Sequence, residues 1–546
     1  MGKDAARKAF DQVLLYHERT KHQFDRPARS AGYMDWANQP DPFRFFADCP
    51  QVRLPFLRQD PDLAMEGLFS DAQMPAQPLV LTHIAGMIEL SMGLSAWKKI
   101  PGSTWSLRIN PSSGNLHPTE SWWLLPEHEQ MQGGLFHYNP YRHVLERRAD
   151  LPPSSPAKWR QYFGADGFFV ALSSIFWREA WKYGERAFRY CQHDIGHALA
   201  ALRFAARLMG WRMSLVHGIG DEDLQRLLGF DRTAWHPGEA EEAEVLCWVG
   251  IADAKPNPVS LPAAIIDDLA GQELRGRPEP LSPNRRPWPL IEAVAAACRK
   301  PLAGAEPVSL PEFPAAVLPA SPYSAAQVIR RRRSAVDFDV RRSHISREHF
   351  MGCLQACLPH RHRPPFNLGL GVPQVHLFLF VHYVVELEPG FYALVRNPDH
   401  FQELQACTHP QFAWRQVDEQ LPLYLLEAGD GRAAAKLISC NQDIAGDGAF
   451  SLGMVARFQE TLQAAPYLYK QLFWEAGMIG QVLYLQAEAY GLRGTGIGCF
   501  FDDSMHEVCG FRDNRFQSLY HFTLGSPIED ERLTTLPPYH HLSPGG

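Results

Sequence analysis

Residues 188–230 read FRYCQHDIGHALAALRFAARLMGWRMSLVHGIGDEDLQRLLGF, and residues 469–511 read YKQLFWEAGMIGQVLYLQAEAYGLRGTGIGCFFDDSMHEVCGF. At a constant offset of 281, without a gap, the two segments match in glycines, charges and aromatic rings together. The matched pairs include Asp194 with Glu475, Gly196 with Gly477, and Arg212 with Arg493. Two unrelated amphipathic helices would match in apolar period, but not also in the glycines that end them. The match predicts a chain built from two copies of one unit.

Composition places the chain among globular proteins. Its 546 residues are 45% hydrophobic and 21% charged, which is enough to bury the cores of about two to four domains. The net charge of -7 provides no overall basic field for nucleic acid or an anionic membrane. Ten cysteines without a Cys-x-x-Cys pair indicate reduced thiols, and the first residues lack the apolar core of a signal peptide. We therefore expect a cytoplasmic protein.

The order of patterns along the chain predicts four segments. An N-terminal arm covers 1–75, a first unit 76–255, a proline-rich linker 256–323, and a second unit 324–546. The linker prediction rests on fourteen prolines between Lys255 and Pro322, which remove backbone donors and break helices. Each unit mixes helices with strands, so the predicted fold class is α+β. The expected helices are 79–94, 290–299, 346–358 and 469–490; the expected strands are 121–126, 245–251, 375–385 and 520–525; the expected hairpins are 133–144 and 390–400.

A first motif with chemical meaning is RINPSSGNLHPTE at 108–120, directly before a predicted strand. Its small residues let the backbone press against a flat ring, while Ser112, Ser113 and the Asn115 amide can reach polar edges of that ring. A plain Pro-Ser turn is the ordinary alternative, and these residues alone leave it open.

A second motif is RRRRSAVDF at 330–338, at the end of a predicted helix. Guanidinium groups bind phosphate through two parallel hydrogen bonds, and the neighbouring serine adds a donor. A run of four arginines is also typical of a solvated or nucleic-acid-facing patch.

A third motif is GLRGTGIG at 491–498, after the long helix. Glycines permit positive φ and close backbone approach, so amide donors of such a loop can face a bound ring. A helix C-cap followed by a loose loop explains Gly491 equally well. The aligned WRMSLVH at 211–217 in the first copy is too bulky for this contact.

A fourth motif, WKYGERAFR at 181–189, contains Lys182 and Tyr183. Taking a proton from carbon requires a base with a pKa near neutrality, and desolvation can bring a lysine toward that range. A surface Lys-Tyr pair is the ordinary alternative. His193 and His197 are four apart on a helix and could supply half a zinc site, but a third ligand is not evident. A packing role is favoured for them, and no metal is expected.

Taken together, the four motifs resemble the nitroreductase superfamily, in its SagB-type azoline-dehydrogenase (thiazole/oxazole-forming) branch. The resemblance covers roughly residues 15–540 and departs at Val336, where the family commonly has a basic residue. It implies FMN as the cofactor and places Lys182 and Tyr183 in the catalytic role. The cofactor-binding residues that it implies are Arg108, Pro111, Ser112, Ser113, Asn115, Arg332, Arg333, Ser334, Gly494, Thr495, Gly496 and Arg532.

The two copies retain different parts of this set of cofactor-binding motifs. Ordinary members of the superfamily are intertwined homodimers in which both subunits hold each FMN. Here the arginine motif 330–338 and the glycine motif 491–498 are present in the second copy, and the Pro-Ser-Ser motif 108–120 is present in the first. The resemblance implies that these three motifs belong to one site. For the mirror site, 18–21 matches poorly and 367–373 has no serine. The resemblance implies two nitroreductase-like FMN-binding units fused as an intramolecular pseudo-dimer, with one FMN per chain.

The implied activity is FMN-dependent oxidation of a peptide-derived heterocycle or a related natural-product intermediate, with dioxygen as the electron acceptor. Two alternatives stay open: an NAD(P)H-dependent nitro or quinone reductase, and a non-catalytic scaffold in a biosynthetic complex. The expected partner is a small-molecule or peptide substrate rather than nucleic acid or a membrane, and further pairing of chains stays open.

Overall fold

A computed structural model of the chain describes residues 3–72, 74–128, 131–251, 261–302, 310–314 and 318–542. Residues 256–260, 303–309 and 315–317 of the predicted linker, and a few residues of the predicted arm and units, lie outside the described residues.

Within the described residues, the chain forms two seven-stranded antiparallel sheets with corresponding strand orders. The first sheet has the order β2 (Gln51–Arg53), β7 (Val144–Asp150), β6 (Gly134–Asn139), β5 (Thr119–Leu125), β8 (Gly167–Ser174), β10 (Glu242–Gly250), β9 (Arg212–Leu215). The second has the order β14 (Arg415–Gln416), β15 (Leu423–Ala428), β13 (Gly390–Leu394), β12 (Val375–Val381), β16 (Phe450–Arg457), β18 (Phe516–Gly525), β17 (Arg493–Ile497). The predicted mixture of helices and strands is therefore present in both halves.

The two sheets enclose one central core and carry an outer core each. Because successive side chains of a strand point to opposite faces, Phe168, Val170 and Leu172 of β8 enter the central core, while Phe169 and Ala171 enter an outer one. The side chains of β12 alternate in the same way between the central core and the outer core of the second unit. Strands buried on both faces explain the nearly continuous apolar runs of these segments.

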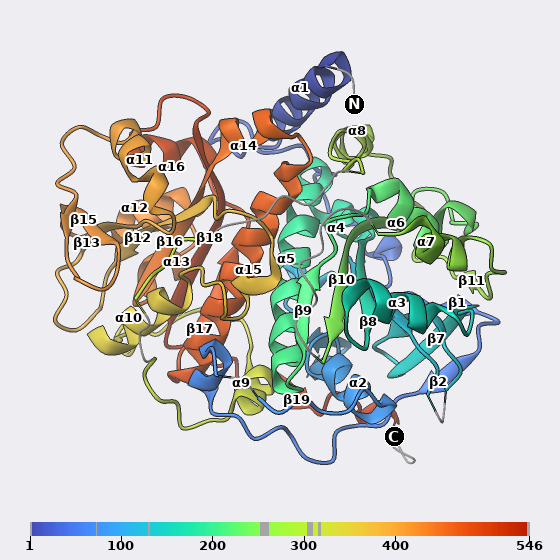
Figure 1. Cartoon of the computed structure of the whole chain (residues 1–546). Helices are drawn as coiled ribbons and strands as arrows, with labels where there is room; N and C mark the ends of the chain where they lie inside the picture. Colours follow the sequence, from blue (N-terminus) through green and yellow to red (C-terminus); the bar gives the residue numbers. More distant parts are fainter. Residues whose placement is uncertain are drawn as a thin grey trace.

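Two long helices, α5 (Ala187–Leu208) and α15 (Leu468–Ala489), run side by side between the sheets (Figure 1). Their bounds coincide at the offset of 281, as do those of α6 (Asp221–Leu228) and α16 (Asp502–Cys509). The helices cross at Gly196 and Gly477, where a Cβ on either glycine would overlap the other helix's backbone. Glycine is therefore required at the crossing for steric reasons.

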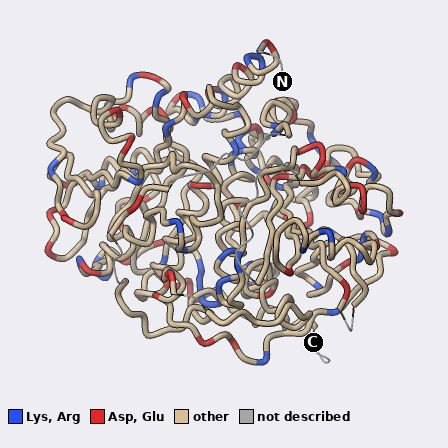
Figure 2. The backbone as a smooth tube through the Cα atoms, viewed as in Figure 1, with Lys and Arg blue, Asp and Glu red and all other residues tan. Residues whose placement is uncertain are grey.

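Charged contacts across the crossing are reciprocal. Arg189 of α5 pairs with Asp502 at 2.7 Å, and Lys470 of α15 pairs with Asp221 at 2.9 Å. These four side chains are buried and occupy corresponding positions in the two units. Buried charges need such partners, so the pairs fix how the two units dock. Figure 2 shows basic and acidic residues interspersed along the whole backbone.

Segments outside the two repeats also join the units. The predicted arm contains α1 (Lys3–Arg19) and contributes β1 (Phe46–Ala47) and β2, the latter as an edge of the first sheet. The predicted linker contains the expected helix, α8 (Pro289–Ala297), together with α7 (Ala263–Ala270) and β11 (Arg277–Pro278), which pairs with β1. The C-terminal β19 (Thr534–Leu536) adds to the hairpin of β3 (Leu94–Ile100) and β4 (Ser103–Arg108). The remaining α-helices are α2 (Leu81–Glu89), α3 (Ser155–Phe163), α4 (Phe176–Tyr183), α9 (Ala325–Arg331), α10 (Arg347–Ala356), α11 (Phe401–Cys407), α12 (Arg432–Ile438), α13 (Ile444–Asp447) and α14 (Phe458–Ala464).

Two local predictions were wrong. The expected hairpin at 390–400 is absent, since β13 ends at Leu394 and pairs with β15 after an intervening 3-10 turn and α11. The expected glycine loop at 491–498 is largely strand β17, which pairs with β18. Backbone pairing supplied by a distant strand overrides the low strand propensity of its glycines.

Candidate functional site

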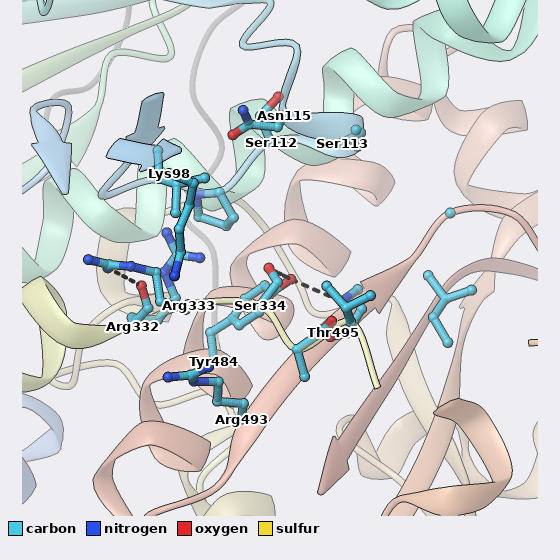
Figure 3. A pocket seen from close by; sticks show the side chains of 18 of the residues that line it. Lys98, Ser112, Ser113, Asn115, Arg332, Arg333, Ser334, Tyr484, Arg493 and Thr495 are labelled. Carbon is cyan, nitrogen blue, oxygen red and sulfur yellow. Dashed lines mark hydrogen bonds between the residues drawn. The ribbon is translucent and has the colours of Figure 1, made fainter. Parts of the chain in front are cut away.

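A cavity of about 810 Å³ lies where the two units meet. Most of the residues predicted to contact a cofactor line it, and they come from both units (Figure 3). These lining residues are Arg108, Pro111, Ser112, Ser113, Asn115, Arg332, Arg333, Ser334, Thr495, Gly496 and Arg532. Tyr183 also lines the cavity, whereas Lys182 and Gly494 lie directly beside lining residues. The structure thus brings together segments that are several hundred residues apart.

The Pro-Ser-Ser loop is held by its own hydrogen bonds. The Ser112 hydroxyl accepts from the His117 amide at 2.8 Å, and the Asn115 Nδ2 group donates to the Ser106 carbonyl at 2.9 Å. The Asn115 Oδ1 atom lies 2.9 Å from His117 Nε2. Burial lowers the pKa of His117 well below its usual value, so the ring is neutral. The Asn115 side-chain amide is therefore already hydrogen-bonded to Ser106 and His117. The sequence analysis had predicted that this amide contacts a bound ring.

Gly114 joins this loop to the Lys-Tyr segment at the end of α4. It has φ +59°, and a Cβ there would lie 2.5 Å from the Tyr183 hydroxyl and 3.2 Å from Lys182 Nζ. The ammonium group of Lys182 also lies 5.1 Å from the centre of the Tyr183 ring. Glycine satisfies both the left-handed backbone and the close approach. Lys182 and Tyr183 are consequently packed against the loop that lines the cavity.

Asp194 of α5 is a cavity-lining carboxyl that the sequence analysis did not select. Its Oδ1 atom accepts hydrogen bonds from the amide and the hydroxyl of Ser113, both at 3.1 Å. Burial raises the pKa of Asp194 to about 7, against the lowering effect of those hydrogen bonds. The side chain can therefore gain or lose a proton near neutral pH.

The corresponding residue of the second unit has a different environment. Glu475 accepts a hydrogen bond from the Gln374 amide at 2.9 Å, as Asp194 does from Ser113, but it also pairs with buried Arg396. Among the described residues, Asp194 has no such ion pair. Both units thus have a hydrogen bond from a loop amide to a carboxylate of the long helix. Among the described residues, only the carboxylate of the second unit also pairs with a cation, Arg396. Asp194 and Glu475 are both acidic at the offset of 281, and this match was the sequence signal that could have identified Asp194 as a candidate site residue.

Glu179 is a second buried carboxyl in this region. It lies one helical turn before Lys182, and neither of its carboxylate oxygens has a hydrogen-bond partner in the described part of the chain. Burial raises the pKa of Glu179 well above its usual value, and the charge of Asp194 raises it further. Burial therefore favours the protonated form of Glu179, and Glu179 and Asp194 together form a cluster of buried carboxyl groups beside the cavity.

Arginines form the cationic side of the cavity. Arg332 donates to the carbonyls of Arg108 and Ile109 at 2.7 and 3.0 Å, and Arg333 donates to the Ser95 carbonyl at 2.9 Å. The guanidinium groups of Arg332 and Arg333, which belong to the second unit, thus also hydrogen-bond to the backbone of the first unit. Burial lowers the pKa of Arg108 and of Arg333 to about 10, so both stay charged at neutral pH.

These arginines have unused binding capacity. The buried Nε atoms of Arg108 and Arg332 lack hydrogen-bond partners, and no carboxylate of the described residues pairs with Arg108, Arg332 or Arg333. Two further cations, Lys98 of β3 and Arg493 of β17, also line the cavity, although sequence reasoning did not select them. Uncompensated guanidinium groups facing a cavity are suited to an anionic ligand. Arg532 is less suited, because its side chain is 85% exposed and pairs with Asp530.

Strand β17 forms the wall beside the arginine segment. The Ser334 and Tyr484 hydroxyls lie 2.9 Å apart, and the Gly496 amide donates to the Tyr484 hydroxyl at 3.0 Å. The Thr495 hydroxyl donates to the Ala335 carbonyl at 2.6 Å, which ties β17 to the arginine segment. Glycine is required at 494, 496 and 498 by the rings of Phe522, Tyr520 and Tyr190, because a Cβ would overlap each ring. Positive φ, the expected reason, applies in this segment only to Gly491.

Part of the lining of this cavity has counterparts around a much smaller cavity in the other half. Leu215, His217 and Gln471 there occupy the places of Gly496, Gly498 and Tyr190, and the small cavity has a volume of about 30 Å³. Large side chains stand where the large cavity has glycines. The two halves therefore differ in how much space they leave for a ligand.

The described residues include no group of three or more His, Cys, Asp or Glu side chains arranged to hold a metal ion. His193 stacks on Tyr520 with ring centres 4.2 Å apart, and His197 lies 3.1 Å from the Tyr520 hydroxyl. No helix within the described ranges combines the length and the apolar character that crossing a membrane demands.

Comparisons with known proteins agree with this architecture. The model of the Nitroreductase family matches residues 97–250. The structure of a "putative nitroreductase" from Anabaena variabilis superposes with a TM-score of 0.68 and 20% identity, over 95% of this chain and 99% of that chain. A "putative nitroreductase" from Ralstonia eutropha covers 40% of this chain and 89% of its own, with 16% identity and a TM-score of 0.28. The E. coli microcin synthetase McbBCD complex covers 45% and 94%, with 17% identity and a TM-score of 0.27. No curated protein matches the chain.

The segment that matches the Nitroreductase family model, 97–250, includes the Pro-Ser-Ser loop, Lys182, Tyr183 and Asp194. The Anabaena superposition, at low identity, establishes that nearly the whole chain shares the fold of that protein.

Proposed function

We propose that this chain is an FMN-dependent dehydrogenase or oxidase that holds one FMN between its two units. Its substrate is a peptide-derived heterocycle or a related natural-product intermediate. The observation that carries the proposal is one cavity of about 810 Å³ on which motifs of both units converge. A volume of this size suits a cofactor together with part of a substrate.

The donor chemistry of the cavity fits FMN. Orphaned Nε atoms on Arg108 and Arg332, with the charge of Arg333, would hold the phosphate, and Ser334 would add a hydroxyl. The flat ring would lie against the Ser112–Ser113 loop and the backbone of β17, since Ser112, Ser113, Gly496 and Gly498 line the cavity. In this proposal the phosphate tail of the cofactor would point toward the cavity's cationic side.

Bound FMN would supply a hydride acceptor, so the protein's own residues must handle the proton. Asp194 holds a proton at its carboxyl with a pKa of about 7, which is suited to accepting one at neutral pH. Tyr183 lines the cavity and Lys182 lies behind it against Gly114. We assign substrate deprotonation to Lys182 and Tyr183, with Tyr183 as the member of the pair that faces the cavity, and proton storage to Asp194 and Glu179.

The same proposal describes the chain as a tandem duplication that folds as an intramolecular pseudo-dimer. Coincident helix bounds at the offset of 281, corresponding sheet orders and reciprocal ion pairs support it. The contrast between cavities of about 810 and about 30 Å³, whose linings correspond in part, supports a single FMN per chain.

The decisive experiment is an absorbance spectrum of the purified protein with a flavin-to-protein ratio. We expect a flavin spectrum with one FMN per chain, and R332A should lower the ratio because it removes the buried guanidinium. A colourless protein that cannot be reconstituted, or two flavins per chain, contradicts the proposal. Rapid bleaching by NAD(P)H without oxygen would instead indicate a reductase.

A second experiment separates catalysis from cofactor binding. K182A should retain flavin and lose substrate oxidation, because Lys182 lies beside the cavity rather than on its cationic side. Loss of flavin from K182A contradicts the role assigned to this lysine.

A further inference from the structure

Two cysteine thiols meet at the wall of the same cavity. Cys499 follows β17 and lines the cavity, and its Sγ atom lies 2.8 Å from Sγ of Cys440, which follows α12. Both cysteines are partly exposed, whereas seven of the ten cysteines are buried. The only other partly exposed thiol, Cys49, has its pKa raised to about 11 by burial. The pair therefore combines proximity with access.

The surroundings of Cys499 favour a thiolate. The Ala28 amide donates to His22 Nδ1 at 3.0 Å, so the ring proton is on Nε2, and the His22 ring hydrogen-bonds Cys499. Arg186 donates to the Gly498 carbonyl at 3.0 Å and adds positive charge nearby. The hydrogen bond with Cys440 is the largest cause that lowers the pKa of Cys499, to about 5, and the same bond raises the pKa of Cys440. One sulfur is thus a nucleophile and the other keeps its proton.

The backbone holds Cys440 in a strained conformation beside its partner. Cys440 and Asn441 have φ of 56° and 57°, a left-handed region that residues with side chains seldom adopt. The Gln442 side chain fixes this turn by donating to the Ser439 carbonyl at 2.8 Å and to the Cys499 carbonyl at 3.1 Å. Backbone strain of this kind concentrates at functional sites.

We propose that Cys440 and Cys499 form a reversible redox pair, in which Cys499 attacks a hydroperoxide that enters the cavity and Cys440 then closes a disulfide. In the first step the Cys499 thiolate bonds to the terminal oxygen of ROOH, the O–O bond breaks, and Cys499–SOH and RO⁻ form. In the second step the Cys440 sulfur displaces hydroxide from Cys499–SOH, and its thiol proton leaves with that hydroxide as water. The two sulfurs lose two electrons, the peroxide gains them, and RO⁻ takes a proton from solvent.

Closing the pair requires little motion, because a disulfide bond is about 2.05 Å long and the sulfurs are already 2.8 Å apart. Closure would also change the cavity's electrostatics. Burial is the largest cause that raises the pKa of Tyr183 well above its usual value, and the negative charge of a Cys499 thiolate is one of the smaller causes. A neutral disulfide removes the thiolate charge, so oxidation would lower the pKa of Tyr183. The chemistry needs only the two sulfurs and a peroxide, and it stands independently of the flavin proposal.

The test uses the reduced full-length protein treated with an equimolar amount of hydrogen peroxide. After the remaining thiols are alkylated, peptide mass spectrometry should find a fragment that joins Cys440 to Cys499, with two thiols lost. A dithiol reductant should restore both thiols. Absence of this fragment, or oxidation of other cysteines to the same extent, overturns the proposal.

Single variants test the assigned order of attack. In C440S the sulfenic acid on Cys499 should persist and be trapped by dimedone, whereas in C499S the remaining Cys440 should stay unoxidised. C49S is the matched control, since Cys49 is partly exposed but distant from the pair in the fold, and it should form the same cross-linked fragment as the unsubstituted protein. Equal trapping in C440S and C499S would contradict the asymmetry.

Discussion

Gly114 shows how one small residue sets the geometry of the site. Its φ of +59° is in the left-handed region, which is unfavourable for a residue with a side chain. In addition, a Cβ at this position would lie only 2.5 Å from the Tyr183 hydroxyl. We predict that G114A lowers the free energy of unfolding by about 1–2 kcal/mol through backbone strain and reduces turnover by roughly tenfold or more through displaced Lys182 and Tyr183. Denaturant unfolding and steady-state kinetics measure the two effects.

Gly102 provides the control for backbone strain alone. It has φ +82° with open space around it, in the turn between β3 and β4. G102A should show a similar loss of stability with unchanged turnover. Equal turnover in G114A and G102A would mean that the contact with the Lys-Tyr segment has no catalytic consequence.

Asp194 should make stability depend on pH. Its pKa is about 7 in the folded protein and 3.8 in the reference state, so between these values the folded chain keeps a proton that the unfolded chain has lost. Stability from this group therefore falls as pH rises from about 4 to about 7, by about 1.4 kcal/mol for each unit of pKa difference. D194N should be less sensitive to pH over this window. Unfolding midpoints at a series of pH values test this, and parallel curves would contradict it.

The sequence motifs identified residues that line the cavity more readily than buried residues with a shifted pKa. Ser112, Ser113 and Arg332 stand in short local patterns, and the structure brings them to one cavity. Asp194, by contrast, becomes a titrating group only because the central core desolvates it and because unit one lacks a counterpart of Arg396. Desolvation arises from packing between distant segments, which local spacing does not encode. The same holds for Cys440 and Cys499, which are 59 residues apart.

At the scale of elements, β17 depends on three glycines packed against rings. A Cβ at Gly496 would overlap the Tyr520 hydroxyl, so G496A must displace either the strand or the ring. We predict that G496A lowers the ratio of flavin to protein at least severalfold. Y520F removes the overlapping hydroxyl, so the double variant G496A/Y520F should recover part of the flavin.

G491A is the matched control for β17. Gly491 has φ +74° and open space around it, so the substitution adds strain of about 1 kcal/mol without filling the cavity wall. Its flavin ratio should equal that of the unsubstituted protein. If G491A and G496A lose flavin equally, general instability rather than the cavity wall is the cause.

Elements were predictable where their pattern is local. The long helix of the second unit was expected at 469–490, nearly its observed bounds, because an apolar period and a terminal glycine specify it. The expected hairpin at 390–400 failed because β13 takes its partner from 423–428, beyond a helix. The pattern of one strand does not identify a distant neighbour, and glycine content alone does not exclude an edge strand held by aromatic packing.

At the scale of the whole molecule, the two units are joined through buried charges rather than by the linker alone. Asp502 accepts from both Arg186 and Arg189, at 3.0 and 2.7 Å, and all three side chains are buried. On the other side, Lys470 has two partners, Asp221 at 2.9 Å and Glu244 at 3.2 Å. The two junctions are reciprocal in position but opposite in sign, because one surrounds a carboxylate with cations and the other a cation with carboxylates.

This asymmetry predicts unequal costs for matched substitutions. D502N leaves two buried guanidinium groups without a carboxylate and should cost about 3–5 kcal/mol, whereas D221N leaves Lys470 paired with Glu244 and should cost less. Denaturant unfolding followed by tryptophan fluorescence and by circular dichroism measures both. Because α5 and α15 share one core, we expect the two signals to change together in each variant. A larger loss in D221N, or separate transitions for the two units, would show that the junction does not couple them as its charges indicate.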